Sequence, residues 1–466
     1  MLDITRLRSL VTRSRVVRRS AAALALATFV GACGRRPPVD RGATPAGRGP
    51  AVPSALDVSR LYREVGLFVE TTPVPFVGAT HAFASESPDT TLVLLTLSLP
   101  NRALTFVREG DHYRAGYDVI VDARRGGSSA RREQGRQTVR VASYKETSRG
   151  DESLIFQQYL RLAPETYALN LTVRDVESGR TTTRDLNVTV PRIATPGLSS
   201  AVPVYEAEPR LRRDTLPVLV PNPRATAVFG QDSSLMIYLE RYGGTGPVQA
   251  AVRDARGVEL WRDSVPLPSN ATMTSGMVTL PITTLGPGID TFVAWTAGGR
   301  DTTRTRLVVS FGEGIAITSF EEMLSFLRYF APGETLQPLR NAAPADRGRA
   351  WLAFLHATDP DPSTAEHEAL RDYFIRIEQA NLRYREEGGP GWLTDRGKVF
   401  ISLGDPDQIY EQGQGDIAQR GRVQIWEYAQ YRTQLVFIDQ SGFGRYRLTT
   451  TSELEFQSLV RRIRQR

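Results

Sequence analysis

The stretch GWLTDRGKVFISLGDPDQIYE, from Gly391 to Glu411, contains the strongest local structural signals in the chain. We interpret the segment from Lys398 to Leu403 as a strand. Gly397 and Gly404 stand at its two ends, where glycine permits a positive φ. Trp392 is expected to be buried as a wedge beneath the resulting hairpin. The stretch therefore predicts a strand followed by a tight turn.

The polar residues of this stretch have a structural and a catalytic interpretation. Asp395 follows Thr394 and can cap the backbone or close an Asx turn. Pro406 would fix the next turn, whose backbone would donate a hydrogen bond to Asp407. In the catalytic interpretation, two of Asp395, Asp405 and Asp407 are the acid and base of a hydrolase. That mechanism needs two carboxylates facing each other across a cleft, about 5 to 9.5 Å apart. The structural interpretation explains more of the residues.

Together these residues resemble the GWxTD-domain proteins of bacteria, a family whose chemistry is uncharacterised. The resemblance spans about residues 316 to 466, and it implies a domain rather than a reaction. The candidate motif and binding residues are Gly391, Trp392, Thr394, Asp395, Arg396, Gly397, Gly404, Pro406, Asp407 and Trp426.

The N-terminus has the pattern of an export signal. Six arginines precede the apolar run from Ala21 to Val30, which at about ten residues is too short to span a bilayer. The run leads into Val30-Gly31-Ala32-Cys33, which resembles a bacterial lipobox in which Cys33 is acylated. We therefore predict a signal peptide at 1–32 and a lipidated, flexible tether at 33–55. Gly34, rather than an aspartate, resembles the pattern of lipoproteins passed to the outer membrane.

Charge and composition exclude several functions. The formal net charge is +7, of which residues 1–32 contribute +5 from six arginines and one aspartate, leaving about +2 for the rest. The chain beyond the signal therefore has no electrostatic preference for nucleic acid. Cys33 is the only cysteine, so the mature chain has no disulfide partner. The four histidines lack metal-ligand spacing, and we expect neither a metal nor another cofactor.

Two β-rich regions precede the C-terminal domain. Apolar residues occupy every second position from Tyr167 to Val173, which is typical of half-buried antiparallel strands. Several such strands joined by turns predict a β-sandwich. We place one Ig-like β-sandwich at 60–192 and a second at 198–312. Similar Gly-Arg turns at Gly179 and Gly299 precede the last strand of each region and favour a duplication.

The C-terminal region, 316–466, is expected to be an α+β domain. Ser319 and Glu322 form a capping box ahead of its first helix. The remaining elements are expected in this order: a helix at 345–357, a helix capped by Ser363, strands at 423–428, 434–438 and 446–449, and a helix at 453–464. Asp439 is expected to end a strand that neighbours the motif.

These features predict a lipid-anchored, non-enzymatic protein of the cell envelope. Two sandwich modules would serve as a spacer, and the C-terminal domain would bind an envelope protein or glycan. A glycan or peptide hydrolase is the alternative from another class, and a purely structural envelope component is a third possibility. A cleft holding two carboxylates with perturbed pKa values would favour the hydrolase. An aromatic surface patch near Trp392 and Trp426 would favour binding.

Overall fold

The computed structural model describes residues 58–148, 153–228, 232–265, 267, 272–296, 298–299, 301–310, 317–363, 367–386, 390–413 and 422–464. The predicted signal peptide, the tether and Cys33 lie outside these ranges. Within them, no helix is both long enough and apolar enough to cross a membrane.

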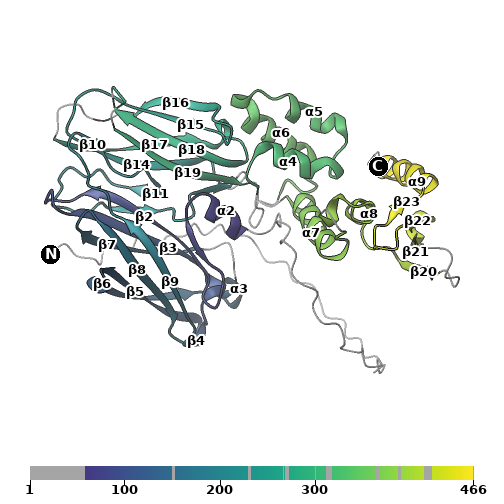
Figure 1. Ribbon diagram of the computed structural model, residues 1–466, viewed down its shortest axis with the longest axis horizontal. Coiled ribbons are helices and arrows are strands. Elements are labelled where there is room, and N and C mark those ends of the chain that lie inside the picture. The colour runs from purple at the N-terminus through teal and green to yellow at the C-terminus, as the bar shows by residue number, and fades with distance from the viewer. Residues whose placement is uncertain are drawn as a thin grey trace. The chain divides into compact units, whose positions relative to one another are not determined.

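The first β-sandwich consists of two antiparallel sheets whose inner faces share one core (Figure 1). Leu95, Val119 and Leu171 are fully buried in that core, so apolar residues of both sheets exclude water between them. A short helix, α2 (Val58–Glu64), precedes the strands. One sheet has the order β1 (Phe68–Glu70), β2 (Phe76–Ala84), β3 (Thr91–Pro100), β7 (Ser153–Leu162). The other has the order β4 (Val107–Glu109), β5 (His112–Arg125), β8 (Thr166–Asp175), β9 (Thr181–Thr189), with β6 (Ser128–Val141) paired to β5.

The second β-sandwich also consists of two sheets, and all its strand pairs are antiparallel except that of β13 (Thr226–Val228) with β19 (Thr302–Ser310), which is parallel (Figure 1). Its core contains Ile237, Val252 and Phe292, all fully buried. One sheet has the order β10 (Gly197–Leu198), β14 (Ser234–Tyr242), β11 (Val202–Ala207), β12 (Leu219–Pro221), with β17 (Met273–Pro281) paired to β14. The other has the order β13 (Thr226–Val228), β19 (Thr302–Ser310), β18 (Gly288–Thr296), β15 (Val248–Arg253), β16 (Glu259–Val265).

The two sandwiches share a strand order. The run β9-β8-β5-β6 of the first corresponds to β19-β18-β15-β16 of the second, and β2-β3-β7 corresponds to β11-β14-β17. The last hairpin of each module turns at a glycine with positive φ, 73° at Gly179 and 66° at Gly299. The common topology supports the duplication that the repeated Gly-Arg turns suggested.

The C-terminal region is an α+β domain, as predicted. Ser319 caps its first helix by accepting a hydrogen bond from the backbone of Glu322 (3.1 Å). Its strands form an antiparallel meander in the order β20-β21-β22-β23. The helices are α4 (Phe320–Phe326), α5 (Gly333–Asn341), α6 (Arg347–Thr358), α7 (Glu368–Arg383), α8 (Asp395–Leu403) and α9 (Thr450–Arg464), and the strands are β20 (Gln408–Gly413), β21 (Arg422–Tyr428), β22 (Thr433–Asp439) and β23 (Arg447–Leu448).

The core of this domain is continuous with that of the second sandwich. Buried residues of both, from Ala201 to Leu459, belong to one apolar cluster. Helix α6 lies directly on the single turn η2 (Ile282–Thr284), because a Cβ on Gly348 would be only 2.4 Å from the carbonyl oxygen of Thr283. A fragment that began at residue 316 would therefore lose part of the surface on which α6 packs.

The motif segment differs from the predicted hairpin. The segment predicted as a strand from Lys398 to Leu403 belongs instead to helix α8. Three consecutive apolar residues fit either a strand or a buried helix, and periodicity alone does not separate the two. Thr394 decides the outcome, because its side chain caps the first turn of α8. Trp392 consequently lies in the single turn η5 (Gly391–Leu393) rather than beneath a hairpin.

Three further elements differ from expectation. Helix α7 is capped by His367, whose Nδ1 accepts from the backbone of Leu370 (3.1 Å), and not by Ser363. An imidazole nitrogen replaces the expected hydroxyl as the acceptor. Helix α5 and strand β20 were not predicted, because α5 contains Pro338 and β20 follows a turn without clear alternation.

Candidate functional site

The two glycines of the motif allow backbone segments to touch. A Cβ on Gly391 would lie 2.0 Å from the carbonyl oxygen of Ala380, in α7. A Cβ on Gly397 would lie 1.9 Å from the carbonyl oxygen of Gly391. These are backbone atoms, so no side-chain rotation relieves either contact. Gly397 was predicted to supply a positive φ, but it lies in helix α8 and is required for this close approach instead. Gly404 does have the expected positive φ, 84°.

Thr394 joins η5 to α8. Its hydroxyl donates to the carbonyl oxygen of Gly391 (2.8 Å) and accepts from the backbone N–H of Gly397 (3.0 Å). The side chain is buried, so both hydrogen bonds are shielded from water. This one residue fixes the direction in which α8 begins.

Trp392 fills the space between α7 and the first helix of the domain. It is 7% exposed, and its ring centroid lies 5.0 Å from that of Phe326 and 6.2 Å from that of Tyr329. The guanidinium of Arg328 lies 4.9 Å from the ring centroid, in cation–π contact. The backbone N–H of Trp392 donates to Asn381 (3.1 Å). Trp392 is therefore buried, and its indole ring packs in the interior of the domain.

The three candidate carboxylates serve three different segments. Asp395 accepts from the backbone N–H of Leu448 at 2.9 Å, which ties α8 to β23. Asp405 is exposed and pairs with Arg383 at 2.5 Å. Asp407 accepts from the backbone N–H of Ala429 at 2.7 Å, so it bridges to the end of β21 rather than bonding within its own turn. Pro406 precedes it in that turn. Each carboxylate already has a partner that neutralises it or occupies an oxygen.

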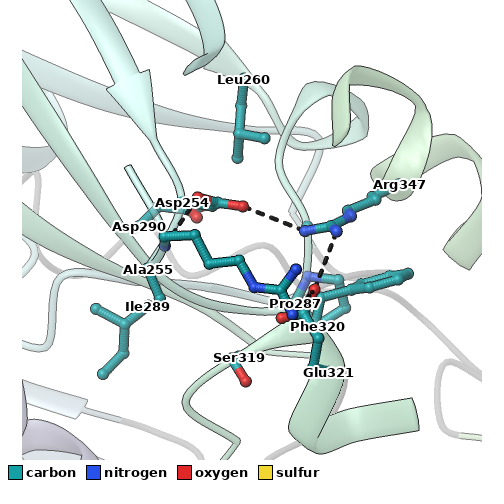
Figure 2. A pocket seen from close by; sticks show the side chains of 12 residues that line it. Asp254, Ala255, Leu260, Pro287, Ile289, Asp290, Ser319, Phe320, Glu321 and Arg347 are labelled. Carbon is teal, nitrogen blue, oxygen red and sulfur yellow. Dashed lines mark hydrogen bonds and ion pairs between the residues drawn. The ribbon is translucent and has the colours of Figure 1, made fainter. Parts of the chain in front are cut away.

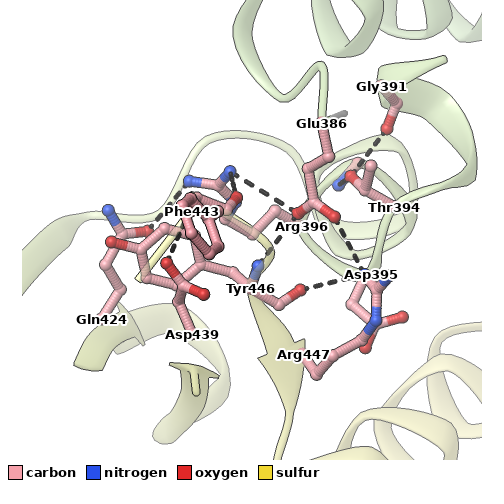
Figure 3. Close-up of polar contacts among 12 residues, drawn as sticks. Glu386, Gly391, Thr394, Asp395, Arg396, Gln424, Asp439, Phe443, Tyr446 and Arg447 are labelled. Atoms are coloured by element: carbon pink, nitrogen blue, oxygen red, sulfur yellow. Dashed lines mark hydrogen bonds and ion pairs between the residues drawn. The ribbon is translucent and has the colours of Figure 1, made fainter. Parts of the chain in front are cut away.

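Arg396 connects the motif to the loop between β22 and β23, as Figure 3 shows. Its guanidinium donates to the carbonyl oxygen of Gly444 (3.3 Å) and lies 4.1 Å from the ring centroid of Tyr446. Glu386 is 3.6 Å away and also accepts from the backbone N–H of Tyr446 (3.1 Å). Burial lowers the pKa of Arg396, an effect that the nearby Glu386 carboxylate opposes. The sequence did not identify Glu386 as a partner of the motif, because no sequence pattern links it to Arg396, and Tyr446 lies 60 positions further on.

Asp439 determines the shape of the same loop. It is fully buried and accepts hydrogen bonds from Ser441 (2.8 Å) and from the backbone N–H groups of Gly442 (3.0 Å) and Gly444 (2.6 Å). Burial raises the pKa of this carboxyl, but these hydrogen bonds outweigh burial and lower it overall. Phe443, at the centre of the loop, is 81% exposed. No sequence pattern identified this residue, because the exposure of a single aromatic side chain depends on the fold around it.

Trp426 belongs to the core as well. It is fully buried, with ring centroids 4.7 Å from Phe437 and 5.3 Å from Tyr384. Trp392 and Trp426 therefore do not form the aromatic surface patch that would have indicated binding. Among the described residues there is also no group of three side chains that could hold a metal ion.

A second polar cluster lines a small pocket where the second sandwich meets α4 and α6 (Figure 2). Arg347 pairs with Asp254 (3.2 Å) and Glu321 (3.0 Å). Asp290 is 3% exposed, and its Oδ2 has no hydrogen-bond partner among the described residues. Burial and the charge of Asp254 raise the pKa of Asp290 well above its usual range, although Arg347 opposes the shift. The sequence did not single out this cluster.

The fold and the motif define a multidomain protein in which two β-sandwiches precede an α+β domain. Residues 298–454 match the model of the GWxTD domain family, so the chain carries a GWxTD domain. The match begins at the turn before β19, earlier than the expected residue 316. No curated protein sequence is significantly similar to the chain.

Several solved structures show limited similarity. The BSP domain of a biofilm associated protein is 9% identical, with a TM-score of 0.17 and 55% of each chain covered. Dimeric latent PorU from Porphyromonas gingivalis is 15% identical, with a TM-score of 0.24, 53% of this chain and 20% of that one. Bifidobacterium dentium beta-glucuronidase, complexed with coumarin-3-O-glucuronide, is 10% identical, with a TM-score of 0.17, 52% of this chain and 44% of that one. The chain thus spans about half, or less, of these proteins.

Proposed function

We propose that the chain is a lipid-anchored, non-enzymatic protein of the cell envelope, and that its GWxTD domain binds an envelope protein or glycan through the 440–446 loop. The observation that carries this proposal is Phe443, which is 81% exposed in a loop fixed by buried Asp439 and by Arg396. An exposed aromatic ring on a rigid loop loses little conformational entropy when a partner covers it. Aromatic side chains of this kind dominate many binding interfaces.

The distribution of exposed apolar side chains supports the same proposal. Fourteen large apolar side chains are exposed among the described residues, and half of them lie in the C-terminal domain, which makes up a little over a third of the described residues. Single exposed apolar residues are ordinary, and this modest excess favours contact with a partner. The seven are Ile375, Leu382, Leu393, Ile409, Tyr410, Phe443 and Leu454.

The hydrolase alternative has less support. Paired-carboxylate catalysis requires two acids free to face a substrate across a cleft. Asp395 and Asp407 each accept a hydrogen bond from a backbone N–H, and Asp405 pairs with Arg383. These partners account for the three carboxylates as elements of the fold.

Anchoring through Cys33 rests on the sequence pattern, since the residue lies outside the described ranges. The expected location is the outer membrane, because Gly34 follows the cysteine. Cys33→Ser should transfer the protein from the membrane fraction to the soluble fraction. Retention of the variant in the membrane would contradict this anchor, and recovery of the unmodified protein with the inner membrane alone would contradict the location.

The binding surface can be tested by site-specific photo-crosslinking in intact envelopes. A photoreactive phenylalanine at position 443 should yield a discrete crosslinked product. The matched control is position 211, because Leu211 is also highly exposed (71%) but lies in the second sandwich. Phe443→Ser should abolish capture of that partner while leaving stability within about 0.5 kcal/mol, as is usual for an exposed residue. Equal crosslinking at both positions, or none at 443, would contradict the proposal.

A further inference from the structure

A groove of about 270 Å³ lies between α7, α8 and α9. Its size is close to the lower end for ligand pockets, about 300 Å³. Its walls are mainly apolar and aromatic, and they include residues of η3 (Leu327–Tyr329) and of the motif helix α8. The large apolar and aromatic lining residues are Tyr329, Phe330, Tyr373, Ile401, Val460 and Ile463.

Two guanidinium groups lie at this groove without an acidic partner in the described part of the chain. Arg376 donates to the carbonyl oxygen of Ile401 (3.3 Å), and Arg464 donates to the carbonyl oxygen of Tyr329 (2.7 Å). Each arginine is oriented by one backbone hydrogen bond and keeps its other N–H groups for a ligand. Asp372 also lines the groove, but it pairs with Arg371 at 3.2 Å. The groove therefore combines an apolar wall with an excess of positive charge.

These features favour an acyl chain over a peptide. The walls come from helices, whose backbone groups bond within the helix, and the two arginines occupy the carbonyl oxygens of Ile401 and Tyr329. An extended peptide would find no strand edge with which to pair its amides. An alkyl chain has no such groups to satisfy, and a carboxylate at its end matches a guanidinium. We infer that the groove binds a single-chain fatty carboxylate, with the tail on the apolar wall and the head at Arg376 and Arg464.

This inference concerns a different surface from Phe443 and goes beyond the proposed function. Calorimetric titration of the full chain with hexanoate, octanoate and decanoate tests it. Affinity should rise about fourfold per added methylene until the groove is filled, which corresponds to about 0.8 kcal/mol. Decanol, which has the same tail without the charge, should bind at least tenfold more weakly than decanoate, because the charge-assisted hydrogen bonds are lost.

Variants then locate the site. Arg376→Gln and Arg464→Gln should each weaken decanoate binding by about tenfold or more. Arg461→Gln is the matched control, because Arg461 is exposed on the same helix α9 but does not line the groove, and this variant should bind like the unmodified chain. The inference is wrong if decanol binds as tightly as decanoate or if Arg461→Gln is equally damaging. It is also wrong if decanoate does not bind, or if an apolar peptide with a free C-terminal carboxylate binds more tightly.

Discussion

Replacing Gly397 by alanine separates helix propensity from backbone packing. Gly397 is in the first turn of α8, where propensity alone predicts that alanine stabilises the chain by about 0.5 to 1 kcal/mol. Gly333, at the start of α5, is the matched control, because a Cβ there would meet nothing within 4 Å. The two substitutions are chemically identical, so they differ only in what the new methyl group contacts.

The packing cost at Gly397 follows from two contributions. The new Cβ would lie 1.9 Å from the carbonyl oxygen and 2.8 Å from the carbonyl carbon of Gly391, so α8 must move away from η5. Overpacking of this kind typically costs about 1 to 3 kcal/mol. The movement also weakens the two hydrogen bonds of the Thr394 hydroxyl, worth about 1 kcal/mol each. After the propensity gain is subtracted, Gly397→Ala should destabilise the chain by about 2 to 4 kcal/mol.

Urea unfolding followed by tryptophan fluorescence measures this difference. Three of the five tryptophans lie in the C-terminal domain, so the signal reports its unfolding. The midpoint should fall for Gly397→Ala and remain equal or rise for Gly333→Ala. If both variants shift the midpoint upwards by similar amounts, close packing between η5 and α8 is not what requires a glycine, and the structural account of the motif fails.

Three further predictions concern buried or partly buried groups. Trp392→Ala should lower the free energy of unfolding by about 3 to 5 kcal/mol, and Trp392→Phe by clearly less, in urea melts, because an aromatic ring partly refills the site. Asp395→Asn should lower it by about 1 kcal/mol, since a neutral amide accepts a weaker hydrogen bond from Leu448, whereas a raised midpoint would favour the hydrolase. Because the pKa of Asp290 is raised in the folded chain, its contribution to stability is lost as the pH rises from about 4 towards that folded pKa. Asp290→Asn should therefore stabilise the chain at pH 8 and change its stability little at pH 4. The control is Asp254→Asn, which breaks the pair with Arg347 and should destabilise the chain at pH 8. Equal effects of Asp290→Asn at both pH values would contradict the raised pKa of Asp290.

The β-sandwiches were predictable because alternation records burial directly. Tyr167, Leu169 and Leu171 point into the core and are at most 3% exposed, as their spacing predicted. Each strand has one solvent-exposed face and one buried face, so the alternation can be recognised without knowing which sheet packs against it. The same reasoning identified the capped helix at Ser319, because a capping box is a local arrangement.

The motif helix could not be predicted in the same way. Val399, Phe400 and Ile401 are all at most 1% exposed, so this apolar run by itself shows neither helical nor strand periodicity. The conformation of this segment depends on the cap at Thr394 and on the close backbone contacts at Gly391 and Gly397. Neither can be recognised in a single sequence. Asp439 was expected to end a strand next to the motif, and it does end β22. Its proximity to Arg396 and the pairing of Arg396 with Glu386 were hidden, because they depend on how separate elements pack together.

This difference explains why the motif identifies a domain family more readily than it indicates a function. Gly391 and Gly397 stand where any side chain would overlap a backbone atom, so the fold admits one residue type at each. Such strict steric conditions make a string of residues recognisable, but they act in the interior. Phe443, Arg376 and Arg464 face solvent or a groove, where many residue types would preserve the fold. A recognisable motif therefore marks the scaffold here, and the groups that would meet a partner or a ligand lie on surfaces that only the folded structure brings together.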